Sequence, residues 1–207
     1  MKPKLLVTVF SDYICPFCYI GYLRLVKLRD EYDLKINWRF IEIHPDNPPE
    51  GRPLSELGYP PVQWRQMMEN LRAMAAEEGV ELAERTFTTN SRKALLLAEA
   101  AKEQGLEIFY RLNDRLYEAY FIEQRNLGDP SVLRTIAAEV GIDDTLVDKA
   151  WSEPQYHEKL RTNLREAARL GINGTPTFVI GARVASGAIS VSSLRKMARD
   201  ATPSGPI

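Results

Sequence analysis

A long series of helical patterns in the middle of the chain constrains the fold most. Between residues 62 and 170, apolar residues recur three and four positions apart. The flanking segments, residues 1–61 and 171–207, instead contain short β-branched and apolar runs typical of strands. The sequence therefore predicts an α/β fold in which both ends of the chain form one discontinuous domain, residues 1–61 with 171–207. Residues 62–170 are expected to form an all-helical insertion domain.

The N-terminal segment has the pattern of a strand, a helix and a second strand. Residues 5–10 form a short apolar run typical of a buried strand, and a helical pattern follows from Cys15 to about Tyr32. Pro16 fits the first turn of that helix, because an N–H at that position would have no helical partner. Alternating apolar side chains predict another strand over residues 35–43.

Turn residues and caps divide the rest of the chain. Prolines and glycines are frequent between residues 44 and 61, where one unit is expected to end. Ser91 is expected to cap one helix, and Asp129 followed by Pro130 to begin another. The other helical patterns in the insertion centre on residues 67–75, 95–101, 109–120, 145–151 and 155–170.

The C-terminal segment returns to strand-like patterns. Residues 177–181 and 183–186 are predicted to be paired strands, and Ser192 or Ser193 is expected to cap a last helix. The end of the chain, residues 202–207, contains prolines and a glycine and is expected to be frayed.

Composition excludes several classes of function. Lys plus Arg number 27 and Asp plus Glu number 28, so there is no basic surplus for binding nucleic acid. No apolar run approaches the ~18 residues of a membrane span, and no secretory signal is recognisable. We therefore expect a cytoplasmic protein with no membrane partner.

The two cysteines carry the clearest chemical signal. Cys15 and Cys18 are too close in sequence to stabilise the fold by closing a long loop. Cys15 lies at the expected N-terminus of a helix, where unpaired N–H groups and the helix dipole favour a thiolate. Cys15 is therefore the expected nucleophile, and Cys18, one turn further, the expected resolving thiol.

The cysteine pair has two alternative interpretations. Half of a structural zinc site would need about four ligands in all. Outside the pair only His44 and His157 are histidines, and no second paired motif exists, so no metal is expected. The other alternative is two buried structural cysteines that share this spacing by chance.

A second motif lies before the strand at residue 177. The segment 171–179, Gly-Ile-Asn-Gly-Thr-Pro-Thr-Phe-Val, combines a tight turn with a proline that removes a donor from the sheet. Because only ~5–6% of bonds before proline are cis, this stretch alone favours an ordinary trans proline at a strand start.

Taken together, these motifs resemble the DsbA-like branch of the thioredoxin superfamily. The Cys-Pro-Phe-Cys motif follows a first strand, the segment 171–179 precedes a late strand, and a helical insertion separates them. The run at residues 15–21 and the Pro-Pro-Glu-Gly loop at residues 48–51 are most similar to its FrnE-type members. The resemblance covers nearly the whole chain.

This resemblance implies a thioredoxin-like fold and a substrate site. It places a cis Thr175–Pro176 bond against the sulfur of Cys15, with the backbone of Thr175 offered to an extended substrate. Pro16, Phe17, Thr175 and Pro176 are the expected substrate-binding residues. The implied activity is thiol–disulfide exchange on protein or peptide disulfides, without a cofactor and with glutathione as a candidate reductant. In the cytoplasm we expect the protein to act as an isomerase or a reductase. We expect it to be a monomer or a homodimer.

Two other functions are alternatives to thiol–disulfide exchange. The 2-hydroxychromene-2-carboxylate isomerases and kappa-class transferases share the inserted architecture and bind glutathione. They typically carry a serine where this chain has Cys15, and they need no second thiol. A non-enzymatic binding module is the third hypothesis.

The sequence also predicts the environment of several methionine and histidine side chains. Met67, Met68 and Met74 are interpreted as core residues, with an adaptable peptide groove as the alternative. His44 and His157 are expected on the surface.

Overall fold

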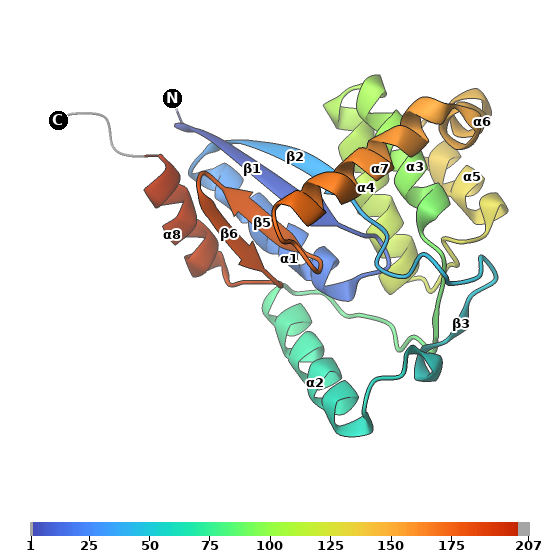
Figure 1. Ribbon diagram of the computed structural model, residues 1–207, viewed down its shortest axis with the longest axis horizontal. Helices are drawn as coiled ribbons and strands as arrows, with labels where there is room; N and C mark the ends of the chain where they lie inside the picture. The colour runs from blue at the N-terminus through green and yellow to red at the C-terminus, as the bar shows by residue number, and fades with distance from the viewer. Residues whose placement is uncertain (1, 203–207) are drawn as a thin grey trace.

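Both ends of the chain meet in one four-stranded sheet, as the computed structural model shows for residues 2–202 (Figure 1). β1 (Lys4–Ser11) is flanked by β2 (Asp33–Phe40) and β5 (Thr177–Ile180), and β6 (Arg183–Ser186) lies at the edge. β1 pairs parallel with β2 and antiparallel with β5. The predicted α/β unit formed by both chain ends is therefore confirmed.

The described residues contain eight α-helices. They are α1 (Pro16–Val26), α2 (Pro61–Glu77), α3 (Arg92–Ala101), α4 (Leu106–Phe121), α5 (Pro130–Glu139), α6 (Asp144–Ser152), α7 (Pro154–Arg169) and α8 (Val191–Ala201). Short 3-10 turns cover Lys27–Asp30, Leu54–Leu57 and Lys102–Gln104. None of these helices is long and apolar enough to cross a lipid bilayer. Met1 and residues 203–207, where a frayed end is expected, lie outside the described residues.

The two faces of the sheet are buried against different helices. Leu5 and Val7 share one face of β1 and belong to the main core, which includes residues of α1 and α8. Phe10 belongs instead to a smaller cluster with Ala167 of α7. Each fully buried Leu, Val or Phe contributes roughly 1.5–3 kcal/mol. The sheet is thus a rigid layer, and β1 fixes the position of the residues that directly follow it in the chain.

The helical block comprises α3 to α7, and α3 lies at its centre. α3 is buried from Ala94 to Ala101 and contacts each of the other four helices. Aromatic rings join the block to α1, because Tyr117 of α4 stacks on Tyr19 with 5.1 Å between ring centroids. The start predicted for α5 is confirmed, since the Asp129 side chain accepts a hydrogen bond from the backbone N–H of Ser131 at 2.8 Å.

One predicted cap has the right position and another was wrong. Ser91 is the N-cap residue of α3 as expected, but its hydroxyl donates to a carboxylate oxygen of Asp12 at 3.0 Å and makes no capping hydrogen bond. The cap of α8 is Ser190, whose hydroxyl accepts a bond from the N–H of Ser193 at 3.2 Å. The helix predicted from Cys15 also ends earlier than expected, because a 3-10 turn follows Val26.

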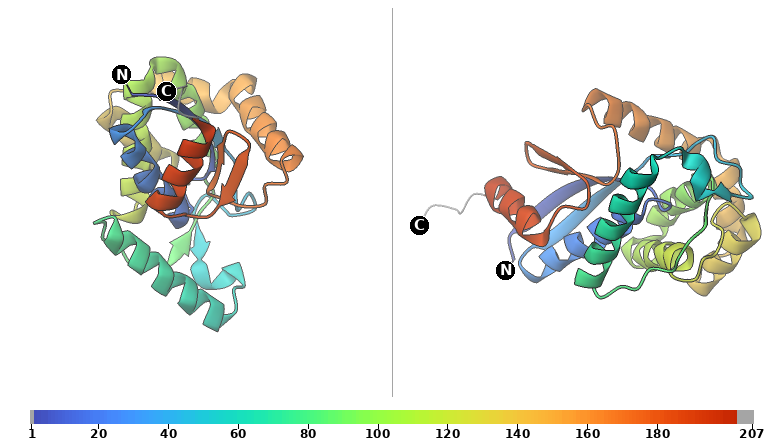
Figure 2. Two further views of the ribbon diagram at one scale, coloured as in Figure 1. Left: turned by 90° about the vertical axis from the view of Figure 1, so that its left-hand side faces the viewer. Right: turned by 90° about the horizontal axis from the view of Figure 1, so that it is seen from below.

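The region 62–170 is not wholly helical, contrary to the prediction. β4 (Phe87–Thr88) pairs antiparallel with β3 (Arg52–Pro53), and together they form a two-stranded ribbon. α2 lies between these strands in the chain and projects away from the sheet (Figure 2, left). The ribbon therefore holds together the two ends of the segment between its strands, residues 54–86, which includes α2 and is called the arm below.

Ion pairs tie the C-terminal end of α2 to α1. The guanidinium of Arg24 is 2.6 Å from the Glu77 carboxylate and 2.9 Å from that of Glu78. Lys27 is 2.7 Å from the second oxygen of Glu78. The side chains of Arg24 and Glu78 are only 5% and 4% exposed, so this pair is shielded from water. The C-terminal end of α2 is thereby held close to the C-terminal end of α1.

Candidate active site

The two cysteines lie where the central strand passes into the first helix. Cys15 is the N-cap residue of α1, with extended backbone angles, and Cys18 lies within the first turn. The N–H of Cys18 donates to the carbonyl of Cys15 at 3.0 Å. Both thiols are free, and the two residues are 5% and 1% exposed respectively. Cys15 is therefore the more accessible of two buried sulfurs.

The surroundings of the two sulfurs shift their acidities in opposite directions. A hydrogen bond from the Cys18 thiol is the largest influence on the pKa of Cys15 and lowers it. The Thr175 hydroxyl and the backbone N–H of Cys18 act in the same direction and together outweigh the effect of burial. Burial raises the pKa of Cys18. Cys15 is thus the more acidic thiol of the pair, and the contacts that lower its pKa include a neighbouring thiol as well as a backbone N–H at the helix start.

The motif before β5 reaches the cysteines from the other end of the chain. The Thr175–Pro176 peptide bond is cis, and the Thr175 carbonyl accepts a hydrogen bond from the Cys15 thiol at 3.5 Å. Pro176 is buried and packs against Gly21 of α1. A Cβ atom at Gly21 would lie 3.1 Å from the Pro176 ring and 2.9 Å from the ring of Phe178. The absence of a side chain at Gly21 lets this loop approach the helix that carries the thiols.

Sequence reasoning missed one buried acid beside the pair. Asp12 is 0% exposed and accepts hydrogen bonds from the N–H groups of Ile14 and Ile43 and from the Ser91 hydroxyl. Burial outweighs these three donors and raises the pKa of Asp12 to about 7. When ionised, Asp12 raises the pKa of Cys15. The only sequence signal was a polar residue directly after an apolar strand.

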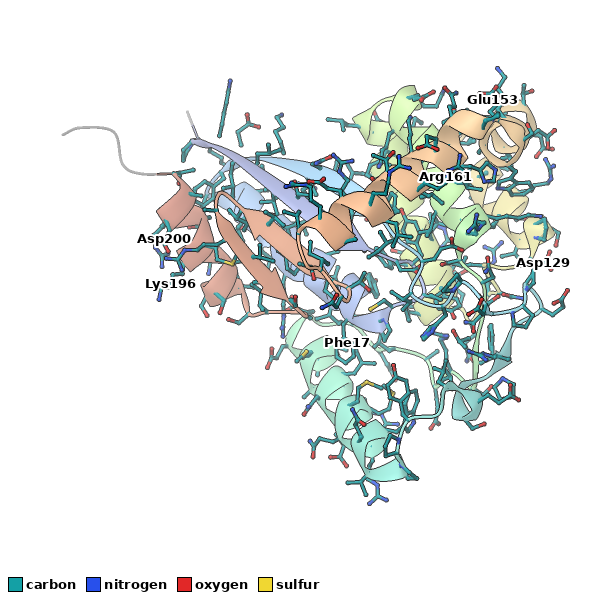
Figure 3. All side chains as sticks on the ribbon, in the orientation of Figure 1. Phe17, Asp129, Glu153, Arg161, Lys196 and Asp200 are labelled. Carbon is teal, nitrogen blue, oxygen red and sulfur yellow. The ribbon has the colours of Figure 1, made fainter. Side chains whose placement is uncertain are left out.

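A cavity of about 600 Å³ opens beside Cys15, between the arm, the ribbon and the loop before β5. Pro16, Phe17 and Thr175 line it, whereas Pro176 does not. Phe17 points from the start of α1 toward α2 (Figure 3). Three of the four residues expected to bind substrate thus share one cavity with the thiol of Cys15.

Two of the minor assignments need correction here. Met67 and Met68 of α2 line the cavity, as the alternative of an adaptable groove requires, while Met74 packs against a core cluster. His44 was expected on the surface, but it is half-buried and lines the same cavity. Burial and the charge of Arg52 lower the pKa of His44. Residues 2–202 contain no group of three or more His, Cys, Asp or Glu side chains arranged to hold a metal ion.

Comparison with known proteins agrees with this geometry. Residues 6–198 match the model of the DSBA-like thioredoxin domain. The chain belongs to this family. Its thioredoxin-like fold with the helical insertion α3–α7 is confirmed, and Cys15 and Cys18 form the Cys-x-x-Cys pair of a DsbA-like oxidoreductase.

Individual relatives cover nearly the whole DsbA-like chain. A crystal structure of a probable DsbA oxidoreductase from Streptomyces coelicolor superposes with a TM-score of 0.85 at 27% identity, over 99% of this chain and 93% of that one. The uncharacterized protein YwbO of Bacillus subtilis is 27% identical over 94% of this chain and 96% of its own length. A 2-hydroxychromene-2-carboxylate isomerase superposes with a TM-score of 0.74 at 19% identity, over 95% of this chain and 97% of that one, which shows a shared fold alone.

Proposed function

We propose that this protein is a thiol–disulfide oxidoreductase that acts on protein or peptide disulfides through Cys15 and Cys18. The observation that carries the proposal is the asymmetry of the pair. Cys15 has a lowered pKa and lines a cavity, whereas burial raises the pKa of Cys18. One sulfur is suited to attack a substrate, and the other is protected until the first has reacted.

The proposed reaction proceeds through a mixed disulfide. The Cys15 thiolate attacks one sulfur of the substrate disulfide, and the other substrate sulfur leaves and takes up a proton. Cys18 then loses its proton and attacks the sulfur of Cys15, which releases the substrate's remaining thiol. Two electrons pass from the cysteine pair to the substrate, and the pair is left as a disulfide. The same steps in reverse would oxidise a substrate dithiol.

Substrate positioning is assigned to the residues around Cys15. The loop of Thr175 and Pro176 lies against the thiol, so its backbone is suited to bind an extended segment. Pro16 and Phe17 offer an apolar surface on the cavity side. The motif at residues 15–21 supports placement among the FrnE-type members of the family. The cytoplasmic location, and the isomerase or reductase direction that follows from it, remain predictions.

Single-cysteine variants test the proposal. Cys18→Ser is expected to accumulate mixed disulfides with a disulfide-bonded protein such as insulin, because the resolving attack is lost. Cys15→Ser is expected to form none, because Cys18 is shielded. Iodoacetamide labelling followed against pH should give Cys15 a pKa below ~8.5. Mixed disulfides formed through Cys18 in Cys15→Ser would contradict the assignment, and full turnover by Cys18→Ser would support the glutathione-dependent alternative.

A further inference from the structure

A pair of buried hydroxyl groups adjoins the Cys18 thiol. Ser11 is the last residue of β1, and its hydroxyl oxygen is 2.8 Å from that of Tyr117 on α4. The Ser11 side chain also hydrogen-bonds to Cys18, and the charge of an ionised Cys18 raises the pKa of Tyr117. All three residues are at most 1% exposed. β1, α1 and α4 thus bring together a small polar cluster from which water is excluded.

The protons of this cluster fix the direction of its hydrogen bonds. Within residues 2–202, the Tyr117 hydroxyl has Ser11 as its single hydrogen-bond partner. If Ser11 donated to Tyr117, the phenolic proton would be buried without an acceptor, which is unfavourable. If Tyr117 donates instead, both protons are used, because Ser11 can then donate to the sulfur of Cys18. The cluster therefore directs a hydroxyl proton at Cys18.

Cys18 is the sulfur of the pair for which such a donor matters most. Burial raises the pKa of this thiol and disfavours its thiolate. The thiolate is nevertheless needed, because Cys18 attacks in the second step of exchange and leaves when the disulfide is reduced. The Thr175 side chain also lowers the pKa of Cys18, but Thr175 lines the substrate cavity. Ser11 lies outside the cavity wall, so a bound substrate leaves its contact with Cys18 intact.

We propose that Ser11 donates the hydrogen bond that stabilises the Cys18 thiolate during exchange, and that Tyr117 is a positioning residue for the Ser11 hydroxyl. The inference rests on the proposed function, because it concerns the second step of that reaction. In that step the Cys18 sulfur bonds to the Cys15 sulfur, and the bond from Cys15 to the substrate sulfur breaks. The departing substrate sulfur keeps the electron pair of that bond and takes up the proton that Cys18 lost. Ser11 and Tyr117 keep their own protons throughout.

Dipyridyl disulfide separates the two steps, because each attack releases one molecule of pyridinethione, which absorbs in the ultraviolet. The reduced protein is mixed with one equivalent of this reagent, and the two releases are followed by absorbance. Loss of a hydrogen bond to a charged group should raise the pKa of Cys18 by about 1–2 units. Each unit lowers the thiolate fraction about tenfold and raises its nucleophilicity about threefold. Ser11→Ala should therefore slow the second release by about three- to tenfold at neutral pH and leave the first release unchanged.

A pH profile distinguishes this role from a structural one. The pH at which the second release is half-maximal should rise in Ser11→Ala, whereas a general loss of packing would lower the rate without moving that pH. Tyr117→Phe keeps the ring that stacks on Tyr19 and should shift the profile in the same direction by a smaller amount. Tyr13→Phe is the matched control, because it removes another buried tyrosine hydroxyl, which donates to Asn113 at 3.1 Å. It should leave both releases unchanged.

The outcomes separate this inference from the proposed function. The exchange reaction requires two releases by the parent protein and one by Cys18→Ser, so a single release by the parent would overturn the proposed function itself. Ser11→Ala with the second rate and pH profile of the parent would overturn the inference while the exchange chemistry stands. An equal slowing of both releases, or an equal effect of Tyr13→Phe, would overturn it too, since either shows a general loss of packing. If Ser11→Ala does not fold, Tyr117→Phe is compared with Tyr13→Phe, and identical pH profiles of these two variants would overturn the inference.

Discussion

Replacing Asp12 by asparagine removes a buried charge and nearly preserves the shape of the side chain. Burial raises the pKa of Asp12 from 3.8 to about 7, a shift of roughly 3 pH units. At ~1.4 kcal/mol per unit, the folded protein carries a cost of about 4 kcal/mol when this carboxyl is ionised. The asparagine amide can still accept the bonds from Ile43 and Ser91. It loses the longer bond from Ile14, at 3.3 Å, which costs about 1 kcal/mol.

The sign of the pH effect follows from the direction of this shift. Because the pKa of Asp12 is higher in the folded state than in the unfolded state, the folded protein holds the proton more tightly. Between about pH 4 and pH 7 the unfolded chain releases this proton while the folded protein keeps it. The contribution of Asp12 to stability therefore decreases as pH rises. Asp12→Asn should be less stable than the parent by about 1 kcal/mol near pH 4 and more stable by about 3 kcal/mol at pH 8.

Urea unfolding followed by tryptophan fluorescence from pH 4 to pH 8 measures this difference. Both proteins should carry Cys15→Ser and Cys18→Ser, so that no thiol titrates in the same range. The other ionisable groups are common to both proteins and cancel in the difference. Stability curves that run parallel across the whole range would refute the reasoning. With the cysteines restored, Asp12→Asn should also lower the pKa of Cys15, because the Asp12 charge raises it.

Three further substitutions test the packing around the site. Gly21→Ala should lower the free energy of unfolding by about 1–3 kcal/mol despite the better helix propensity of alanine, because its Cβ would crowd Pro176 and Phe178; a more stable variant in thermal unfolding would contradict this. Arg24→Met should cost about 1–3 kcal/mol in urea unfolding, because the buried Glu78 loses one of its two cationic partners and keeps only Lys27, and adding Glu78→Gln should recover part of the loss. Asp129→Ala should cost about 1 kcal/mol through the loss of a helix cap, whereas an unchanged midpoint of unfolding would show that the cap is dispensable.

The regular elements could be predicted from the sequence because their patterns are local. β6 was predicted with the bounds that it has, Arg183–Ser186, and the helical block followed from its apolar periodicity. The β3–β4 ribbon could not be predicted, because each strand has two residues and Arg52–Pro53 includes a proline. Strands of two residues are too short to show an alternation of apolar and polar side chains, and they are brought together only by the folding of the rest of the chain. The serines at the start of α8 are too close together for sequence to select the cap.

The site was only partly predictable for a related reason. Cys15 and Cys18 are marked by their spacing and by the strand before them, which are local features. The pKa of Asp12 is raised by burial, and the Ser91 hydroxyl that contacts its carboxylate lies 79 positions away in the chain. Burial of a charged group is decided by packing that no short motif records. The buried acid beside the thiols was therefore visible only in the structure.

The contact between Cys15 and Thr175 joins residues 160 positions apart, and this separation has a consequence for synthesis. A ribosome delivers the two thiols almost first and the loop that lies against them almost last. During most of translation the nascent chain therefore carries its cysteines without their partner loop, and β1, which precedes them, still lacks one of its two neighbouring strands. A truncated product ending before Thr175 would contain both thiols but could not form this contact. Completion of the polypeptide is thus a precondition for assembling the site.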